Sequence, residues 1–332
     1  MRGARPWLLP LVPVYAAVLA VKGWLLERGW LRRRRLAGPV ISVGSVSAGG
    51  AGKTPVVLLL AELLGQAGFA VRILSRGYGR GSTAVERVDA RGDAARYGDE
   101  PMLLARRLAE PAAVYVGADR HRAGLLAEQE GAAGEALVYL LDDGFQHRRL
   151  ARDLDVVLLT GRDVEDWLLP GGNRREPLRA LRRANVVVLR EEDRGLAGVV
   201  AEICRGRRQP EVWVIRRRLE AASLPARPVV FSGIARPEGF WAMLAELGCE
   251  AAAEVRFRDH HRYTEADVDR LVGLAREHGA DGFVTTEKDA VKLSAAMLGR
   301  MGRVVAPELR VELVDQEAVV DLMMRVIRNG SL

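Results

Sequence analysis

The feature that most constrains the fold of this chain is the glycine-rich segment GSVSAGGAGKTP at residues 44–55. It follows a short β-branched run at residues 40–43 and opens a helix-like stretch at residues 53–66, which is the setting of a phosphate-binding loop. The usual pattern of such a loop is G-x-x-x-x-G-K-[ST]. Gly52, Lys53 and Thr54 supply its end, whereas Ser47 stands where the first glycine is expected. The loop therefore has to be judged by its context.

The glycines of this loop would let backbone N–H groups approach phosphate oxygens, and the N-terminus of the following helix adds a favourable dipole. Lys53 would neutralise the β- and γ-phosphates of a nucleotide, and Thr54 would bind Mg²⁺. Ser47 can itself donate a hydrogen bond. The alternative is a structural turn that contains GKT by chance. The expected nucleotide contacts are Gly49, Gly50, Ala51, Gly52, Lys53 and Thr54.

From residue 39 onward, short β-branched runs alternate with helical stretches, which is typical of βαβ units and a mainly parallel sheet. The strands are almost continuously apolar, which favours a sheet covered by helices on both faces. We expect strands at residues 40–43, 71–74, 113–116, 137–141, 156–159 and 186–189, and helices at residues 53–66, 101–108, 120–129 and 196–204.

A second α/β series follows a charged, strand-like segment at residues 211–219. We expect its strands at residues 229–231, 254–257 and 282–285 and its helices at residues 239–247, 265–278 and 316–328, with Asp315 as the N-cap of the last helix. A chain of 332 residues suits two domains of about 150 residues each. We therefore expect a hydrophobic N-terminal segment at residues 1–36, a P-loop core at 37–212 and a smaller C-terminal α/β domain at 213–332 that contributes to the substrate site.

The amino-terminal stretch WLLPLVPVYAAVLAVKGWLL, residues 7–26, is apolar apart from Lys22, and its length approaches that of a membrane span. Four consecutive arginines at residues 32–35 follow it, which favours a cytoplasmic location for the downstream chain. A cleaved signal peptide is one alternative, although no convincing A-x-A site precedes Lys22. A helix packed on the protein's own core is another. We expect a membrane anchor that either spans the bilayer or lies in its interface.

The net charge of +7 is compatible with nucleic acid, anionic lipid or phosphorylated substrates as partners. Aromatic residues make up only 5% of the chain and do not interleave with basic residues as they do where bases stack, so nucleic acid is not expected. Cys204 and Cys249 lie far apart without metal-ligand spacing, which argues against a disulfide framework or a zinc site.

Two adjacent acids, Asp142 and Asp143, follow the expected strand at residues 137–141. The carboxyl ends of parallel strands meet at the nucleotide crevice of such a sheet, and a P-loop enzyme needs a carboxylate there to handle Mg²⁺. The pair could instead cap a turn. The upstream phosphate loop favours metal handling.

Three further groups could take part in chemistry, and each has a purely structural alternative. Asp99 and Glu100 immediately precede a helix, where N-capping would explain them. The loop LPGGNRREP at residues 169–177 offers arginines to a phosphate, or it is a solvated turn. The pair His260 and His261 follows Asp259 in a loop that could equally be surface or partial core.

Together these motifs resemble the tetraacyldisaccharide 4′-kinases, the lipid A 4′-kinases of Gram-negative bacteria, over about residues 39–292. The resemblance is carried, in matching order, by VGSVSAGGAGKTP, ILSRGYGR, GDEP, VGADR, DDGFQH, LPGGNRREP, FSGIARP, FRDHHRYT and TTEKDAVKL. The family commonly has Ser or Thr where Ser47 stands, so the irregular loop belongs to the family pattern. It more often has Asn where this chain has Ser45.

The resemblance implies transfer of the ATP γ-phosphate to the 4′-hydroxyl of a tetraacylated disaccharide 1-phosphate, at the cytoplasmic face of the inner membrane. It implies that Asp99 accepts the hydroxyl proton with help from His260, His261 being the adjacent alternative. Thr54, Glu100, Asp142 and Asp143 match the metal positions. Gln146, His147 and Arg175 match other site positions, and of these Gln146 and Arg175 are expected to bind the nucleotide. Arg76, Tyr78 and Arg120 are expected, with His147, to contact the sugar or its phosphate. No obligate protein partner is implied.

Two other classes of function compete with this reading. A regulatory P-loop GTPase or ATPase, acting as a switch or a metallochaperone, would need an Asn/Thr-Lys-x-Asp motif to read guanine. Thr286-Glu287-Lys288-Asp289 has Glu in the second place and Lys in the third, which argues against a GTPase. A membrane-anchored binding module without catalysis would not need the phosphate loop, the acid pair and the histidine loop together.

Overall fold

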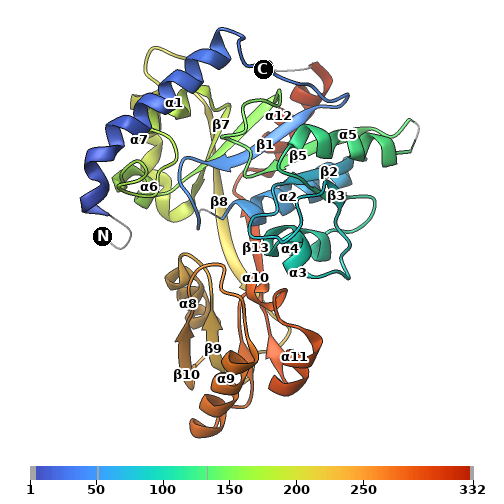
Figure 1. Ribbon diagram of the computed structural model, residues 1–332, viewed down its shortest axis with the longest axis vertical. Coiled ribbons are helices and arrows are strands. Elements are labelled where there is room, and N and C mark those ends of the chain that lie inside the picture. The colour runs from blue at the N-terminus through green and yellow to red at the C-terminus, as the bar shows by residue number, and fades with distance from the viewer. Residues whose placement is uncertain (1–4, 51, 133, 330–332) are drawn as a thin grey trace.

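The computed structural model describes residues 5–50, 52–132 and 134–329. Within these residues the chain forms a nine-stranded sheet and a four-stranded sheet (Figure 1). We call the nine-stranded sheet with its covering helices the large unit, and the four-stranded sheet with α8 to α11 the small unit.

The large sheet is parallel except at its two edges. Its strand order is β13-β8-β7-β6-β1-β5-β2-β4-β3. The strands are β1 (Val40–Ser45), β2 (Ala70–Ser75), β3 (Glu86–Arg87), β4 (Ala113–Val116), β5 (Leu137–Asp142), β6 (Leu154–Leu159), β7 (Val186–Arg190), β8 (Glu211–Glu220) and β13 (Glu308–Leu313). The six strands expected between residues 40 and 189 are therefore confirmed.

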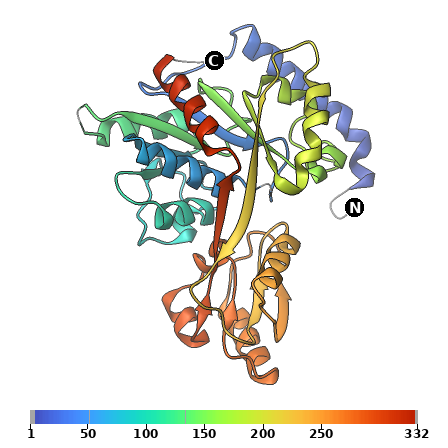
Figure 2. The ribbon, with the colours of Figure 1, turned by 180° about the vertical axis from the view of Figure 1, so that it is seen from behind.

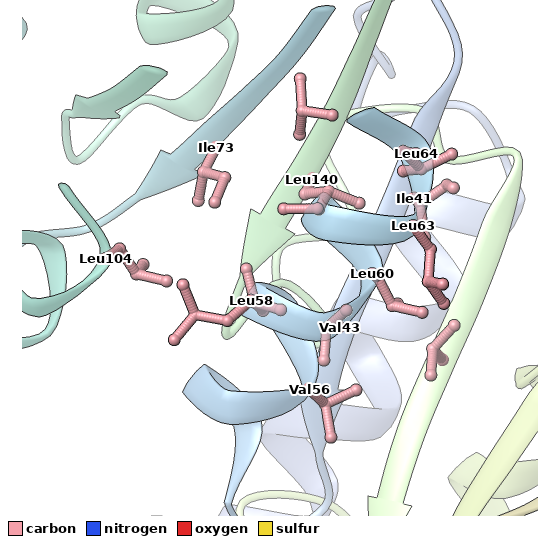
Figure 3. Packing of buried hydrophobic residues seen from close by; sticks show 14 of the residues in the cluster. Ile41, Val43, Val56, Leu58, Leu60, Leu63, Leu64, Ile73, Leu104 and Leu140 are labelled. Carbon is pink, nitrogen blue, oxygen red and sulfur yellow. The ribbon is translucent and has the colours of Figure 1, made fainter. Parts of the chain in front are cut away.

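One face of the large sheet is covered by α2 (Lys53–Gln66), α4 (Asp99–Arg107) and α12 (Gln316–Asn329). Leu60 and Leu64 of α2 are fully buried against Ile41 and Leu140 (Figure 3). Because α2 begins at Lys53, this apolar packing fixes the position of the loop that precedes it. The fold places the glycine-rich segment between the central strand β1 and the largely buried helix α2.

The opposite face carries α5 (Arg120–Glu130), the 3-10 helix η2 (Leu178–Arg183) and α7 (Ala197–Ile203). The helix expected at residues 196–204 differs at its start, because a 3-10 helix, η3 (Glu191–Leu196), leads directly into α7. Two short helices, α3 (Ala94–Tyr97) and α6 (Gly161–Glu165), complete the large unit.

The small sheet is parallel with strand order β10-β9-β11-β12. Its strands are β9 (Val229–Ser232), β10 (Ala253–Arg256), β11 (Phe283–Val284) and β12 (Val304–Val305), and its helices are α8 (Pro237–Glu246), α9 (Glu265–Glu277), α10 (Glu287–Ala290) and α11 (Ala295–Met301). The long strands β8 and β13 pair antiparallel and run between the two units (Figure 1).

The end of the chain returns to the large unit. Strand β13 was not expected from the sequence, and it pairs with β8, with Leu313 opposite Ile215. Helix α12 then packs Leu322 and Met323 into the same core as α2, on the face seen in Figure 2. The Asp315 side chain accepts a hydrogen bond from Ala318 N at 3.1 Å, which confirms the expected N-cap. The bounds 1–36, 37–212 and 213–332 stay a prediction, and this packing joins residues 308–329 to the large sheet.

The amino-terminal segment forms a 3-10 helix, η1 (Pro6–Leu11), that continues as α1 (Val12–Glu27). It is long and apolar enough to cross a membrane, with a mean hydropathy of 1.8 and none of its most apolar window buried. One side nevertheless contacts the large unit, because Tyr15 Oη donates to Arg175 O at 3.0 Å and Arg5 N donates to Gly171 O at 2.7 Å. The helix therefore lies along the protein surface.

Candidate active site

The carboxyl ends of β1, β2, β5, β6 and β7 open onto a cleft of about 1480 Å³ that the small unit closes from the other side. Ligands of open parallel sheets bind at this edge of the strands. The cleft is lined by the predicted site residues Gly49, Gly50, Gly52, Lys53, Thr54, Arg76, Tyr78, Glu100, Arg120, Asp142, Asp143, Gln146, His147, Arg175 and His260. Ala51 lies outside the described residues. Asp99, the expected proton acceptor, is not among the lining side chains and reaches the cleft only through its contact with His260. The fold brings the other described site residues of the prediction together.

The glycine-rich loop has the backbone of an anion cradle. Gly49, Gly50 and Gly52 have φ angles of 70°, 66° and 84°, in the left-handed region that side-chain-bearing residues avoid. Ser45 Oγ donates to Ser47 O at 2.7 Å, so this side chain ties the end of β1 to the loop. The Ser47 hydroxyl is buried and has no hydrogen-bond partner among the described residues. The Ser47 hydroxyl is therefore free of protein partners in the described part of the chain, and its donation to a phosphate stays a prediction.

Asp143 is held by two cations of this loop region. Arg175 makes two hydrogen bonds to its carboxylate, at 2.7 and 2.6 Å, and Lys53 Nζ lies 3.5 Å from Oδ1. Burial alone would raise the pKa of Asp143, but Lys53 and Arg175 outweigh it and keep the pKa below its ordinary value. Asp143 is therefore an ionised carboxylate beside the phosphate loop.

Asp142 is in a different electrostatic environment. It is 1% exposed, accepts from Ser75 Oγ at 3.1 Å through Oδ2, and its Oδ1 has no hydrogen-bond partner among the described residues. Burial, together with the negative charges of Glu100 and Asp143, raises its pKa. A bound cation would relieve both the unpaired oxygen and the repulsion, so these residues fit a metal ion.

The described residues contain no group of three or more His, Cys, Asp or Glu side chains that could hold a metal by themselves. Mg²⁺ in nucleotide sites usually takes one or two carboxylates and completes its shell with phosphates and water. The pair Asp142 and Glu100, with Thr54 at the start of α2, is compatible with such a site.

The two units meet at Asp99 and His260. Asp99 opens α4 in the large unit and is 6% exposed, and its Oδ2 lies 2.9 Å from His260 Nδ1 of the small unit. This hydrogen bond raises the pKa of His260. Burial would raise the pKa of Asp99, but the hydrogen bond from His260 and the charge of Lys288 bring it below its ordinary value. The adjacent His261 instead contacts Asp267 at 3.0 Å, within the small unit.

Lys288, at the start of α10, is a site residue for which the sequence analysis assigned no role. Its Nζ lies 3.0 Å from Glu100 Oε1, 3.5 Å from His260 Nε2 and 3.9 Å from Asp99 Oδ2. Burial would lower the pKa of Lys288, but these carboxylates keep it above its ordinary value. The signal for Lys288 in the sequence is its place in the motif TTEKDAVKL, where the comparison with a guanine-binding motif gives it no role at the site.

A single buried carboxylate, Asp289, organises the small unit's side of the site. Its Oδ2 accepts from Gly233 N at 2.9 Å and from Thr286 Oγ1 at 2.6 Å, and Gly233 O in turn accepts from His260 N at 3.1 Å. Because Asp289 is fully buried in these contacts, it is not available to bind a guanine base. The TEKD sequence is a structural element that positions Lys288 and His260.

Basic side chains surround the remainder of the cleft. Arg120 is 6% exposed, and burial together with the nearby Arg76 lowers its pKa to about 10. Burial and the charge of Arg120 lower the pKa of His147 to about 4, so this imidazole is neutral at pH 7. Tyr78 is exposed and its ring lies 5.0 Å from the ring of His260.

Gln146 has a structural contact as well as a place in the cleft. Its Nε2 donates to Ser45 O at 2.9 Å and to Glu176 Oε1 at 3.0 Å. Its Oε1 is buried without a hydrogen-bond partner in the described part of the chain. Gln146 therefore joins the end of β1 to the loop that carries Arg175.

Known proteins resemble this chain over nearly its whole length. The family model described as tetraacyldisaccharide-1-P 4′-kinase, LpxK, matches residues 4–328. Relatives named tetraacyldisaccharide 4′-kinase include that of Koribacter versatilis, 42% identical over 96% of this chain and 98% of its own length. The relative of that name from Geobacter metallireducens is 38% identical over 94% of this chain and 95% of its own length.

A solved structure agrees with these sequence relatives. The crystal structure of LpxK from Aquifex aeolicus in complex with ATP superposes with a TM-score of 0.76 at 32% identity, covering 96% of this chain and 98% of that one. The match extends over both units and the amino-terminal helix. The chain therefore belongs to the tetraacyldisaccharide-1-P 4′-kinase family and is a kinase of lipid A biosynthesis.

Proposed function

We propose that this kinase transfers the γ-phosphate of ATP to the 4′-hydroxyl of a tetraacylated disaccharide 1-phosphate, with Asp99 and His260 removing the hydroxyl proton. The observation that carries the proposal is the 2.9 Å contact of Asp99 with His260, because His260 lines the same cleft as the phosphate loop. The ATP complex of the Aquifex aeolicus relative supports ATP as the donor.

The chemistry demands alignment and charge neutralisation more than a strong base. Asp99 alone is a weak base, since its pKa lies below the ordinary value of 3.8. With Nδ1–H of neutral His260 donating to Asp99, the pair can take up the proton of the attacking hydroxyl as the new P–O bond forms. The ADP oxygen leaves from the opposite side of the phosphorus.

The donor's phosphates would lie in the glycine-rich loop, with Lys53 and Arg175 beside the γ-phosphate. Both side chains are at present bound to Asp143 and would share their charge with the phosphate. Thr54, Glu100, Asp142 and Asp143 would hold Mg²⁺, which when bound neutralises the charge that develops on the phosphate oxygens. Gln146 would support the loop from the end of β1.

The acceptor would enter from the side of the cleft that carries Arg76, Tyr78, Arg120 and His147. Tyr78 is an exposed aromatic ring next to His260, which suits packing on a sugar face close to the base. Arg76 and Arg120 offer charge to the acceptor's phosphate, and the neutral His147 offers a hydrogen-bonding group.

We place the kinase at the cytoplasmic face of the inner membrane, because its acceptor is acylated and α1 presents an apolar stripe. The stripe consists of side chains at helical spacing that are each more than half exposed, namely Leu11 at the end of η1 and Val14, Val18 and Val21 of α1. Tyr15 instead faces the protein. A helix fastened to the protein along one side is suited to lie in the interface plane with the stripe toward the lipid. Lys22 lines the cleft, so the site opens close to this surface.

The test is direct phosphorylation. Purified protein with ATP, Mg²⁺ and a 1-phosphorylated tetraacyl disaccharide in detergent or lipid is expected to yield a 4′-phosphorylated product by mass spectrometry. Intact ATP binding without such a product would contradict the proposed acceptor.

A further inference from the structure

Arg236 of the small unit lies directly on the phosphate loop of the large unit. It is the residue before α8, and a Cβ atom added to Gly50 would lie 2.6 Å from Arg236 Cδ and 2.8 Å from its Nε. A side chain at residue 50 would displace this arginine from its present position, and the φ of 66° at Gly50 independently favours glycine. Arg236 and Lys53 both line the central cleft.

Two contacts with the large unit fix the orientation of the Arg236 guanidinium. Its NH2 lies 3.2 Å from Asp163 Oδ1 and its NH1 donates to Thr160 Oγ1 at 3.2 Å. Asp163 is fully buried, and its other oxygen, Oδ2, accepts from Thr160 N and Thr160 Oγ1 in the capping box of α6. The carboxylate is thus fixed by its own helix through Oδ2 and accepts one hydrogen bond from Arg236 through Oδ1.

The other basic side chains near the phosphate loop contact groups of the large unit. Lys53 and Arg175 both bind Asp143, and Arg190 NH2 donates to Gly50 O at 3.2 Å. Arg236 reaches the loop from the opposite unit and presents a planar fork that matches phosphate oxygens. Phosphoryl transfer spreads negative charge over the equatorial oxygens of the moving group, and an arginine placed there stabilises that charge.

We propose that Arg236 is a further catalytic residue, an arginine finger that the small unit supplies to the γ-phosphate. The inference rests on the proposed function. During transfer the bond from phosphorus to the β-phosphate oxygen breaks, the bond to the acceptor oxygen forms, the hydroxyl proton passes to the Asp99–His260 pair, and ADP leaves. Arg236 keeps its proton and contacts the γ-phosphate oxygens throughout. The same side chain couples chemistry to the closed arrangement of the two units.

The rival explanation is a simple latch, in which Arg236 only holds the two units together through Asp163. Arg236→Ala and Arg236→Lys would remove the fork, whereas Asp163→Asn would weaken the latch and keep the guanidinium. Arg162→Ala is the matched control, because Arg162 also joins α6 to α8, through Glu238 at 3.9 Å, and is largely exposed.

Two measurements distinguish the finger from the latch. The first is kcat and KM for ATP: a finger predicts that both Arg236 variants lower kcat by about 10³-fold, with KM changed little and Asp163→Asn less harmful. The second is calorimetric binding of ADP with Mg²⁺ and aluminium fluoride, a mimic of the moving phosphoryl group. The finger predicts that the Arg236 variants lose the tighter binding that the fluoride gives over ADP alone, whereas Arg162→Ala keeps it.

Equal losses in Arg236→Ala and Asp163→Asn, or full kcat in Arg236→Lys, would overturn the finger. The fluoride complex contains no lipid acceptor. Binding that is unaffected by Arg236→Ala would thus refute the finger even if the acceptor proposed above were wrong, and failure to phosphorylate the disaccharide would leave the binding result interpretable.

Discussion

His260 Nδ1 lies 2.9 Å from Asp99 Oδ2, although the two residues are 161 positions apart in the sequence. Asp99 belongs to the large unit and His260 to the small unit. His260 reaches this position with a φ of 57°, a left-handed conformation that is uncommon for a residue with a side chain. The contact depends on the small unit standing over the large one.

Removing either partner of this contact is expected to slow the chemical step. Asp99→Ala and His260→Ala should each lower kcat by about 10²- to 10⁴-fold, the usual contribution of a positioned base, with ATP affinity changed little. His261→Ala is the control, since His261 contacts Asp267 and not Asp99. Steady-state kinetics with equilibrium ATP binding decide the matter, and wild-type turnover in both variants would refute the pair.

The pH dependence of activity should follow His260 and not His147. The hydrogen bond to Asp99 raises the pKa of His260 above its ordinary value, so kcat should fall as the pH drops through this raised pKa and His260 becomes protonated. The pKa of His147 is about 4, outside this range. His260→Gln should therefore flatten the acidic limb of the pH profile, whereas His147→Gln should retain it at a lower rate.

The same pair predicts a window of stability. The raised pKa of His260 gives stability that is complete below 6.5 and is lost as the pH rises through the folded value. The lowered pKa of Asp99 gives stability that is complete above 3.8 and is lost as the pH falls through the folded value. The difference in Tm between wild type and His260→Gln should be greatest between these two pH values. A difference that keeps growing above pH 8 would contradict the assignment.

Asp142 and Asp143 should respond oppositely to the loss of charge. Asp142→Asn removes repulsion with Glu100 and Asp143, so the nucleotide-free protein should unfold at a higher temperature while its Mg²⁺-dependent activity collapses. Asp143→Asn breaks the paired contacts with Arg175 and should cost about 2 kcal/mol. Thermal unfolding with and without ATP and Mg²⁺ checks both. Destabilisation by Asp142→Asn would argue against a metal role.

The apolar stripe of α1 should govern membrane binding without affecting the nucleotide site. Val14→Asp and Val18→Asp place charges on the exposed face and should lower binding to vesicles of zwitterionic and anionic phospholipid by at least about tenfold. Val314→Asp is the control, because Val314 is also exposed but follows β13. Co-sedimentation, with ATP binding measured in parallel, gives the result; unchanged sedimentation would exclude the stripe as the lipid contact.

The fold could be predicted where the signal was local. The helix at residues 53–66 agrees with α2 to the residue, because the loop glycine marks its start and an apolar face runs to its end. Strand β13 could not be found in this way. Its sequence, ELRVEL, is short and half charged, and it becomes a strand only by pairing with β8, almost a hundred positions earlier in the chain.

The site residues likewise divide into those with a local sequence signal and those that depend on the tertiary fold. Lys53 and Asp142 belong to recognisable motifs at a helix start and a strand end, so their gathering at one cleft could be expected. Asp99 stands at another helix start and contacts His260, which lines that cleft. The roles of Lys288 and Arg236 depend on how the small unit sits over the large one, and no local pattern encodes that placement. Even the contact of Ser45 Oγ with Ser47 O required the loop's actual path.

The buried carboxylate of Asp289 has a consequence for how the active site can vary. Asp289 bonds to both Gly233 and Thr286, and Gly233 O accepts from the backbone of His260. The functional groups of the small unit are therefore held together by hydrogen bonds within that unit. The positions of the reacting groups then depend on how the small unit is oriented against the large unit. Small changes in their relative orientation would shift every reacting group in concert, and no single side chain could compensate for the error.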